Sequence, residues 1–147
     1  FEDCLLFRQP SSNKMINAMV RETKRHSTFK KFFEDPRIKL QHEWYGTYKG
    51  LPFKAKADGV IKGVAVPDIK STSCNTYDKF LESVCEYDYD MQIFHYTEFY
   101  RCDIGCLIAT SKSLNPKIFV VPIDRGSYLW ESGKEKSNHL ISVIKSL

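Results

Sequence analysis

The sequence of 147 residues contains no long apolar run, no internal repeat and no low-complexity tract. A transmembrane helix needs about 20 consecutive apolar residues, so no membrane span and no membrane partner is predicted. The chain starts at Phe1 without a basic segment followed by an apolar one, so we expect no signal peptide. These absences favour a cytoplasmic protein, and the length suits one domain with a single core.

The cysteines lack metal-binding spacing. The five cysteines are Cys4, Cys74, Cys85, Cys102 and Cys106, an odd number without a CxxC pair. A secreted disulfide framework is therefore not predicted, and a reducing compartment fits better. Cys102 and Cys106 could begin an iron–sulfur or zinc site, but no further close pair completes four ligands.

The net charge is mildly positive, at +4 from 22 basic and 18 acidic residues. A charge of this size is weak evidence for nucleic acid binding. The basic residues gather in two segments, Lys24 to Lys31 and Lys49 to Lys62. Such segments are either solvated surface or a track for a phosphate backbone.

The apolar periodicity alternates between helical and strand patterns. Helices are expected from the candidate N-caps Ser11 and Ser12 to Phe33, from 75 to 100 with a break allowed near Glu86, and from 127 to 147. Strands are expected at 40–48, 53–61, 64–69, 104–110 and 117–123. This order predicts an α/β (α+β) fold with a central mixed β-sheet flanked by helices. We expect one domain, residues 1–147, with an N-terminal helical region at 1–36 and a core at 37–147.

Asp58, Asp68 and Lys70 form the most informative pattern. Asp68 and Lys70 are two apart on a predicted strand, so both side chains leave the same face. If residues 62–64 form the turn to the preceding strand, Asp58 lies opposite Asp68, and Lys56 lies opposite Lys70. Two facing carboxylates repel each other, and a divalent cation between them removes the conflict.

These side chains suit a hard cation and a phosphate. Aspartate oxygens favour Mg²⁺, with Mn²⁺ as a substitute, over zinc. A lysine beside the ion can orient metal-bound water and neutralise charge that develops on phosphate, as phosphodiester hydrolysis requires. The alternative is that Asp58 and Asp68 are solvated acids near a turn, with Lys70 as a surface partner.

Two further groups extend the pattern. Glu43 lies on the preceding strand and could supply a third acid, or it is a surface residue on an exposed strand face. Tyr89, Gln92 and Tyr96 share one helical face. Their amide and hydroxyls can hold phosphate oxygens, and a ring can stack on a base, unless the stripe is half-buried packing.

The motif order resembles the PD-(D/E)xK nuclease superfamily. The likeness runs from about Leu40 to Leu147 and includes the segments 50–58, 67–72, 87–96 and the strand pair ending at 120–123. The branch it resembles most is that of exonuclease VIII, the phage-type recombination exonucleases related to lambda exonuclease. The resemblance implies metal-dependent hydrolysis of linear duplex DNA from its ends by a bacterial or phage-encoded enzyme. It also implies a single-strand annealing protein as a partner and a ring-like homo-oligomer.

The resemblance also implies roles for single residues. Asp58 and Asp68 resemble the metal ligands, helped by the backbone carbonyl of Ile69, and Lys70 resembles the catalytic lysine. Glu43 resembles the first motif acid.

The helical face has an implied role as well. Gln92 and Tyr96 resemble the pair that positions the DNA strand, and Tyr89 lies on the same face. Asp68 stands where Glu is more usual in the superfamily, and no helical His motif precedes the first acid. His26 and His42 fit structural roles better.

Two other functions remain open. The same chemistry could belong to an endonuclease of restriction or repair type. A catalytically silent DNA-binding domain with the same fold is the third reading, although the intact Asp58, Asp68 and Lys70 argue against it.

Overall fold

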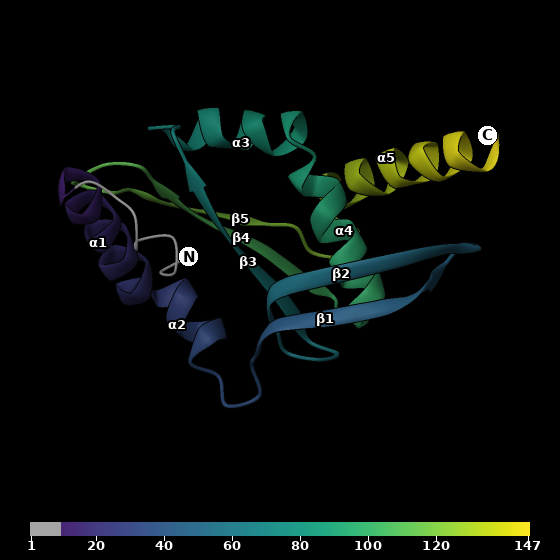
Figure 1. Ribbon diagram of the computed structural model, residues 1–147, viewed down its shortest axis with the longest axis horizontal. Coiled ribbons are helices and arrows are strands. Elements are labelled where there is room, and N and C mark those ends of the chain that lie inside the picture. The colour runs from purple at the N-terminus through teal and green to yellow at the C-terminus, as the bar shows by residue number, and fades with distance from the viewer. Residues whose placement is uncertain (1–9) are drawn as a thin grey trace.

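The computed structural model describes residues 10–147 as five helices and five strands (Figure 1). The helices are α1 (Pro10–Arg25), α2 (Ser27–Phe33), α3 (Tyr77–Glu86), α4 (Tyr89–Tyr100) and α5 (Tyr128–Lys145). The strands are β1 (Lys39–Tyr48), β2 (Leu51–Val60), β3 (Ala65–Thr72), β4 (Ile104–Ser111) and β5 (Ile118–Pro122).

The central sheet is mixed, with the order β3-β4-β5. Strand β3 runs parallel to β4, and β4 runs antiparallel to β5. The long hairpin β1-β2 forms a second sheet beside it, and helices lie around both (Figure 1). The predicted fold class, a mixed sheet flanked by helices, is confirmed.

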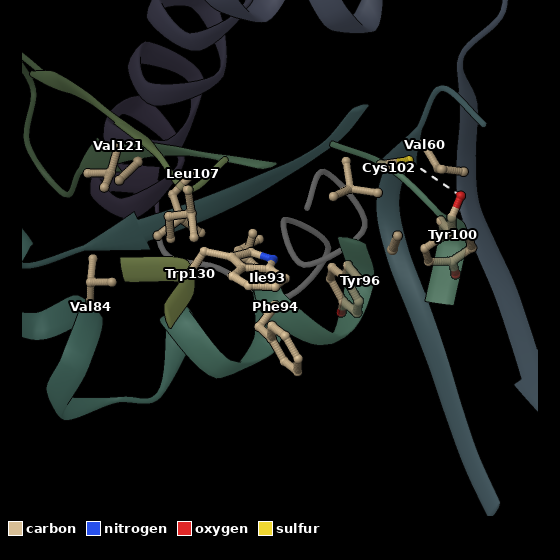
Figure 2. Packing of buried hydrophobic residues seen from close by; sticks show 14 of the residues in the cluster. Val60, Val84, Ile93, Phe94, Tyr96, Tyr100, Cys102, Leu107, Val121 and Trp130 are labelled. Carbon is tan, nitrogen blue, oxygen red and sulfur yellow. Dashed lines mark hydrogen bonds between the residues drawn. The ribbon is translucent and has the colours of Figure 1, made fainter. Parts of the chain in front are cut away.

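Alternate residues of β4 belong to two different hydrophobic core clusters, so both faces of the central sheet are buried. Leu107 packs in the larger cluster with residues of α3, α4 and α5, whereas Ile108 packs in the smaller cluster with Phe32 of α2. Figure 2 shows Leu107 in the larger cluster, close to Ile93 of α4 and Trp130 of α5. Helix α4 therefore covers the face of β3 to which the even-numbered residues of that strand point.

Strands β2 and β3 begin as the predicted hairpin and then separate. Ile61 and Ala65 exchange backbone hydrogen bonds of 2.8 and 3.0 Å around a turn in which Gly63 has φ 74°. The next hydrogen-bonded pair in this register would join Gly59 to Pro67, and proline has no N–H to donate. Only this one bridge links the two strands, and they belong to different sheets.

The predicted facing of Asp58 with Asp68, and of Lys56 with Lys70, across a continuous ladder is therefore wrong. Lys56 instead lies opposite Glu43 in the β1-β2 hairpin. The cause is the missing donor at residue 67, which ends the pairing just before the two carboxylates would meet.

The N-terminal helical region also differs from expectation. Helix α1 begins at Pro10, so the backbones of Ser11 and Ser12 lie within the helix and not before its first residue. The region is broken at His26, whose ring nitrogen accepts the N–H of Thr28 at 3.1 Å and caps α2. His26 thus has the structural role that was expected for it.

The break between α3 and α4 falls at 87–88, near the predicted point, with Asp88 at φ 59°. No helix within residues 10–147 is both long and apolar enough to cross a bilayer. Cys74, Cys85, Cys102 and Cys106 are free, while Cys4 lies outside the described residues. Cys102 and Cys106 belong to different core clusters, so they do not form a common site.

Candidate active site

Asp68 is the most deeply buried acid of the predicted site, with 2% of its surface exposed. It lies in the middle of β3, on the face that α4 covers. Lys70 follows on the same face, as the spacing predicts, and its Nζ lies 2.9 Å from Asp68 Oδ2. Strand β3 thus holds an acid and a lysine side by side under α4.

The surroundings of Asp68 disfavour its charged form. Burial, together with the smaller effect of the Asp58 charge, raises the pKa of this carboxyl to about 7, although the nearby Lys70 ammonium opposes the shift. Although Oδ2 is close to the Lys70 ammonium, it makes no hydrogen bond of acceptable geometry with any group in residues 10–147. We therefore regard the contact as an ion pair that leaves one carboxylate oxygen without a directed partner.

Asp58 reaches β3 with its side chain although its backbone does not pair there. Its Oδ2 accepts the backbone N–H of Ile69 at 2.9 Å, and its Oδ1 accepts from Gln41 Nε2 at 3.3 Å. Gln41 lies beside Asp58 across the hairpin, at a kink with φ 50°. The carboxylate of Asp58 therefore occupies the place of the missing ladder hydrogen bonds, next to Asp68.

Lys70 is held from three sides. Besides Asp68, its ammonium donates to Gln92 Oε1 at 2.7 Å and lies 4.4 Å from the centre of the Tyr89 ring. Gln92 Nε2 donates to the Tyr96 hydroxyl at 3.0 Å. The helical face of α4 that the sequence predicts therefore contacts the predicted catalytic lysine directly.

Tyr96 ties this network to the hairpin. Its hydroxyl donates to the backbone carbonyl of Lys56 at 3.2 Å, and burial together with the charge of Asp68 raises its pKa to about 12. The phenol therefore remains protonated, and both of its polar contacts are within the protein. Gln92 keeps one amide N–H that could meet a phosphate, so the predicted DNA contact by this stripe stays a prediction.

Glu43 is not in contact with the other acids. It is exposed on β1 opposite Lys56 and accepts a hydrogen bond from Tyr45 at 3.0 Å. Alternation along the hairpin places it on the same face as Asp58, because Lys56 and Asp58 are two residues apart on β2. Its role as the first motif acid stays a prediction.

The donor set fits a hard divalent cation. Asp58 and Asp68 supply carboxylates, and Ile69, which follows Asp68 directly and donates its N–H to Asp58, supplies a backbone carbonyl. Asp68 Oδ2, which lies beside the Lys70 ammonium but has no directed hydrogen bond within residues 10–147, is the atom that a cation would satisfy. Residues 10–147 contain no group of three or more acid, His or Cys side chains suited to a metal, so backbone and water would complete the coordination.

A pocket of about 360 Å³ opens beside Asp58 and Ile69. Its apolar wall includes Phe29 and Phe33 of α2, whose rings stack at 4.7 Å, and Leu40 of β1. No sequence signal pointed to this wall, because Phe29 and Phe33 are a helical i, i+4 pair that fits a core position equally well. The pocket provides space for a nucleotide-sized group next to Asp58.

Fold and side chains together define a nuclease-like core of the PD-(D/E)xK class. The chain belongs to the family described as a PDDEXK-like domain of unknown function (DUF3799), whose model matches residues 9–147. The resemblance to the PD-(D/E)xK superfamily is therefore confirmed. None of the curated proteins matches the chain.

Two solved structures have a similar fold. One is a candidate exonuclease from Eubacterium rectale, with a TM-score of 0.70 and 19% identity over 89% of this chain and 52% of that one. The other is a phage-related exonuclease from Haemophilus somnus, with a TM-score of 0.55 and 16% identity over 95% of this chain and 76% of that one. The chain thus spans about half the length of the Eubacterium rectale protein.

Proposed function

We propose that this domain is a metal-dependent deoxyribonuclease that hydrolyses DNA phosphodiester bonds with Mg²⁺, for which Mn²⁺ can substitute. The observation that carries the proposal is the meeting of Asp58 and Asp68. Their strands lie in separate sheets, yet the Asp58 carboxylate bonds to β3 one residue from Asp68, and Lys70 lies 2.9 Å from Asp68. A buried acid beside a second, half-buried acid is costly without a cation to hold.

In the reaction, a water oxygen bonds to phosphorus, the bond to one sugar oxygen breaks, and that oxygen leaves with a proton. A bound divalent cation would polarise the phosphate and lower the pKa of the water. Asp58, Asp68 and the Ile69 carbonyl would hold the cation. Lys70 places a positive charge where the phosphate gains negative charge, and Gln92 fixes the direction of that lysine.

The branch that the sequence resembles suggests the substrate. We propose that the domain degrades linear duplex DNA from its ends, as part of phage-type recombination with a single-strand annealing protein. The exonuclease descriptions of both solved relatives support this choice. The helices before residue 37 and the core after it would act as one domain, and a homo-oligomer would keep the enzyme on its substrate.

The experiment is a cleavage assay on one plasmid in two forms, linear and covalently closed, each with Mg²⁺ and with EDTA. We expect the linear form to disappear with Mg²⁺ and the closed form to persist. Rapid nicking of the closed form would replace the exonuclease with an endonuclease. No cleavage of either form with Mg²⁺ or Mn²⁺ would reject the enzymatic function.

A further inference from the structure

A second pocket lies where α4 ends against the open end of the hairpin. Its volume is about 340 Å³, and its lining includes Lys39 of β1, Lys62 of the turn after β2, and Arg101 after α4. Trp44 and Tyr100 form part of its wall. Figure 2 shows Tyr100 at this end of α4 together with Val60, which also lines the pocket.

The three cations of this pocket have no acidic partner among the described residues. Arg101 has two acids near it in the chain, Glu98 and Asp103, and both form ion pairs with Arg125 instead. Lys39 and Lys62 are exposed and make no ion pair within residues 10–147. Positive charge is therefore concentrated there without compensation, which favours an anion.

His42 adds a buried polar atom to the same pocket. Its ring packs edge-on against Tyr100 at 5.6 Å, and the Tyr100 hydroxyl donates to the His42 carbonyl at 2.6 Å. These contacts fix the ring, but its buried Nδ1 has no hydrogen-bond partner in the part of the chain that is described. The described residues therefore leave a polar atom of this pocket-lining side chain without a partner.

The pocket is close to the candidate active site along β2. Lys39 pairs with Val60, two residues after Asp58, and two residues of a strand span about 7 Å. A nucleic acid strand advances about 3.4 Å per nucleotide, so this distance corresponds to about two nucleotides. A strand whose scissile phosphate lies at Asp58 could therefore place another phosphate at the pocket.

We propose that this pocket, defined by Lys39, Lys62, Arg101 and His42, binds a backbone phosphate of the DNA strand a few nucleotides from the cleaved bond. The inference rests on the proposed nuclease function and adds a substrate-holding site to it. Three uncompensated cations supply the attraction, and Trp44 and Tyr100 form an aromatic part of the wall. The site would recognise the negative charge of the phosphate and not the base sequence, as phosphate contacts do.

The test compares DNA binding by three proteins, namely wild type, the double variant Lys39→Gln/Lys62→Gln, and the control Lys14→Gln/Lys145→Gln. The control removes the same charge from α1 and α5, so it corrects for the general loss of positive charge. Binding of a labelled duplex is measured by fluorescence anisotropy in EDTA, which prevents cleavage, at several salt concentrations. Thermal unfolding confirms that all three proteins are folded.

We expect the pocket variant to bind about tenfold more weakly and the magnitude of its salt slope to fall by about 1, because its contact with one backbone phosphate is lost. The control variant should keep most of the wild-type affinity and most of the wild-type salt slope. Equal affinities and slopes for the two variants would overturn the proposal. A second result would also overturn it. If inorganic phosphate shifts the His42 ring signals in an NMR titration while both variants bind DNA equally, the pocket holds free phosphate and not a DNA phosphate.

The binding test is independent of catalysis. If the wild type fails to cleave DNA with Mg²⁺ but the pocket variant still binds more weakly than the control, the proposed enzyme is wrong and the phosphate site stands. If cleavage occurs and the two variants bind alike, the enzyme stands and the phosphate site is rejected.

Discussion

The backbone N–H of Ile69 donates to the carboxylate of Asp58 across 2.9 Å, in place of a hydrogen bond between two strands. This contact explains how the site is built. Pro67 cannot continue the ladder from β2, so the strands separate, and the side chain of Asp58 enters the space between them. The separation that ends the sheet also brings Asp58 beside Asp68.

The charge state of Asp68 leads to a prediction about stability and pH. Its pKa rises from 3.8 to about 7 on folding, because burial disfavours the carboxylate. The folded state then holds the proton longer than the unfolded state, so the contribution of Asp68 to stability falls as pH rises from about 4 to about 7. Asp68→Asn removes this dependence.

Without metal, the stability of Asp68→Asn relative to wild type should therefore increase by about 2 kcal/mol between about pH 5 and pH 8. Urea unfolding in EDTA at the two pH values measures it. The quantity of interest is the change in relative stability from one pH to the other. The variant leaves Lys70 without its anionic partner at both pH values, so this loss cancels in the comparison. An unchanged difference would show that Asp68 titrates normally.

Lys70→Ala should lower turnover by at least about two orders of magnitude, because it removes the charge that faces the phosphate. Mg²⁺ binding should persist, since the lysine is not a ligand in our account. Calorimetry with Mg²⁺ and single-turnover cleavage separate the two effects. Loss of metal binding together with activity would make Lys70 structural.

Tyr96→Phe and Tyr100→Phe form a matched pair. Each removes a hydroxyl of α4 that donates to a backbone carbonyl of the hairpin, Lys56 in one case and His42 in the other. Each should cost about 1 kcal/mol of stability. Only Tyr96 holds Gln92, so its loss alone should slow cleavage at saturating DNA. Equal rates in the two variants would remove Tyr96 from the positioning of Lys70.

The packing of α5 on α4 gives a further prediction. A Cβ at Gly133 would lie within 2.3 Å of the Asp90 backbone oxygen, so Gly133→Ala must push α5 away from α4. We expect a loss of about 2 to 3 kcal/mol. Gly126→Ala is the control, because its Cβ meets no atom within 4 Å and the cost comes from its φ of 83° alone. Similar losses would contradict the close approach of the helices.

Much of this arrangement followed from local signals in the sequence. The turn at 62–64 and the shared face of Asp68 and Lys70 depend on neighbouring residues, and both are present as predicted. The separation of β2 from β3 was missed, although Pro67 carries the signal for it. A proline at a hydrogen-bonded position predicts the end of a ladder.

Other features depend on contacts between distant segments. The hydrogen bond from Lys70 to Gln92 joins β3 to α4, and the sequence only placed Gln92 on a helical face. The pocket wall of Phe29 and Phe33 comes from α2, which no spacing linked to Asp58. Such contacts are set by how the layers pack, which periodicity does not reveal.

The most direct test of the central claim is the cleavage of a labelled linear duplex, with Mg²⁺ or EDTA, by wild type, Asp58→Asn and Asp68→Asn. Each variant keeps the size of the side chain and removes one charged ligand of the cation. We predict that wild type cleaves the duplex with Mg²⁺ and not with EDTA, and that neither variant cleaves it with Mg²⁺. Cleavage in EDTA, or near wild-type cleavage by either folded variant, would contradict a cation held between Asp58 and Asp68.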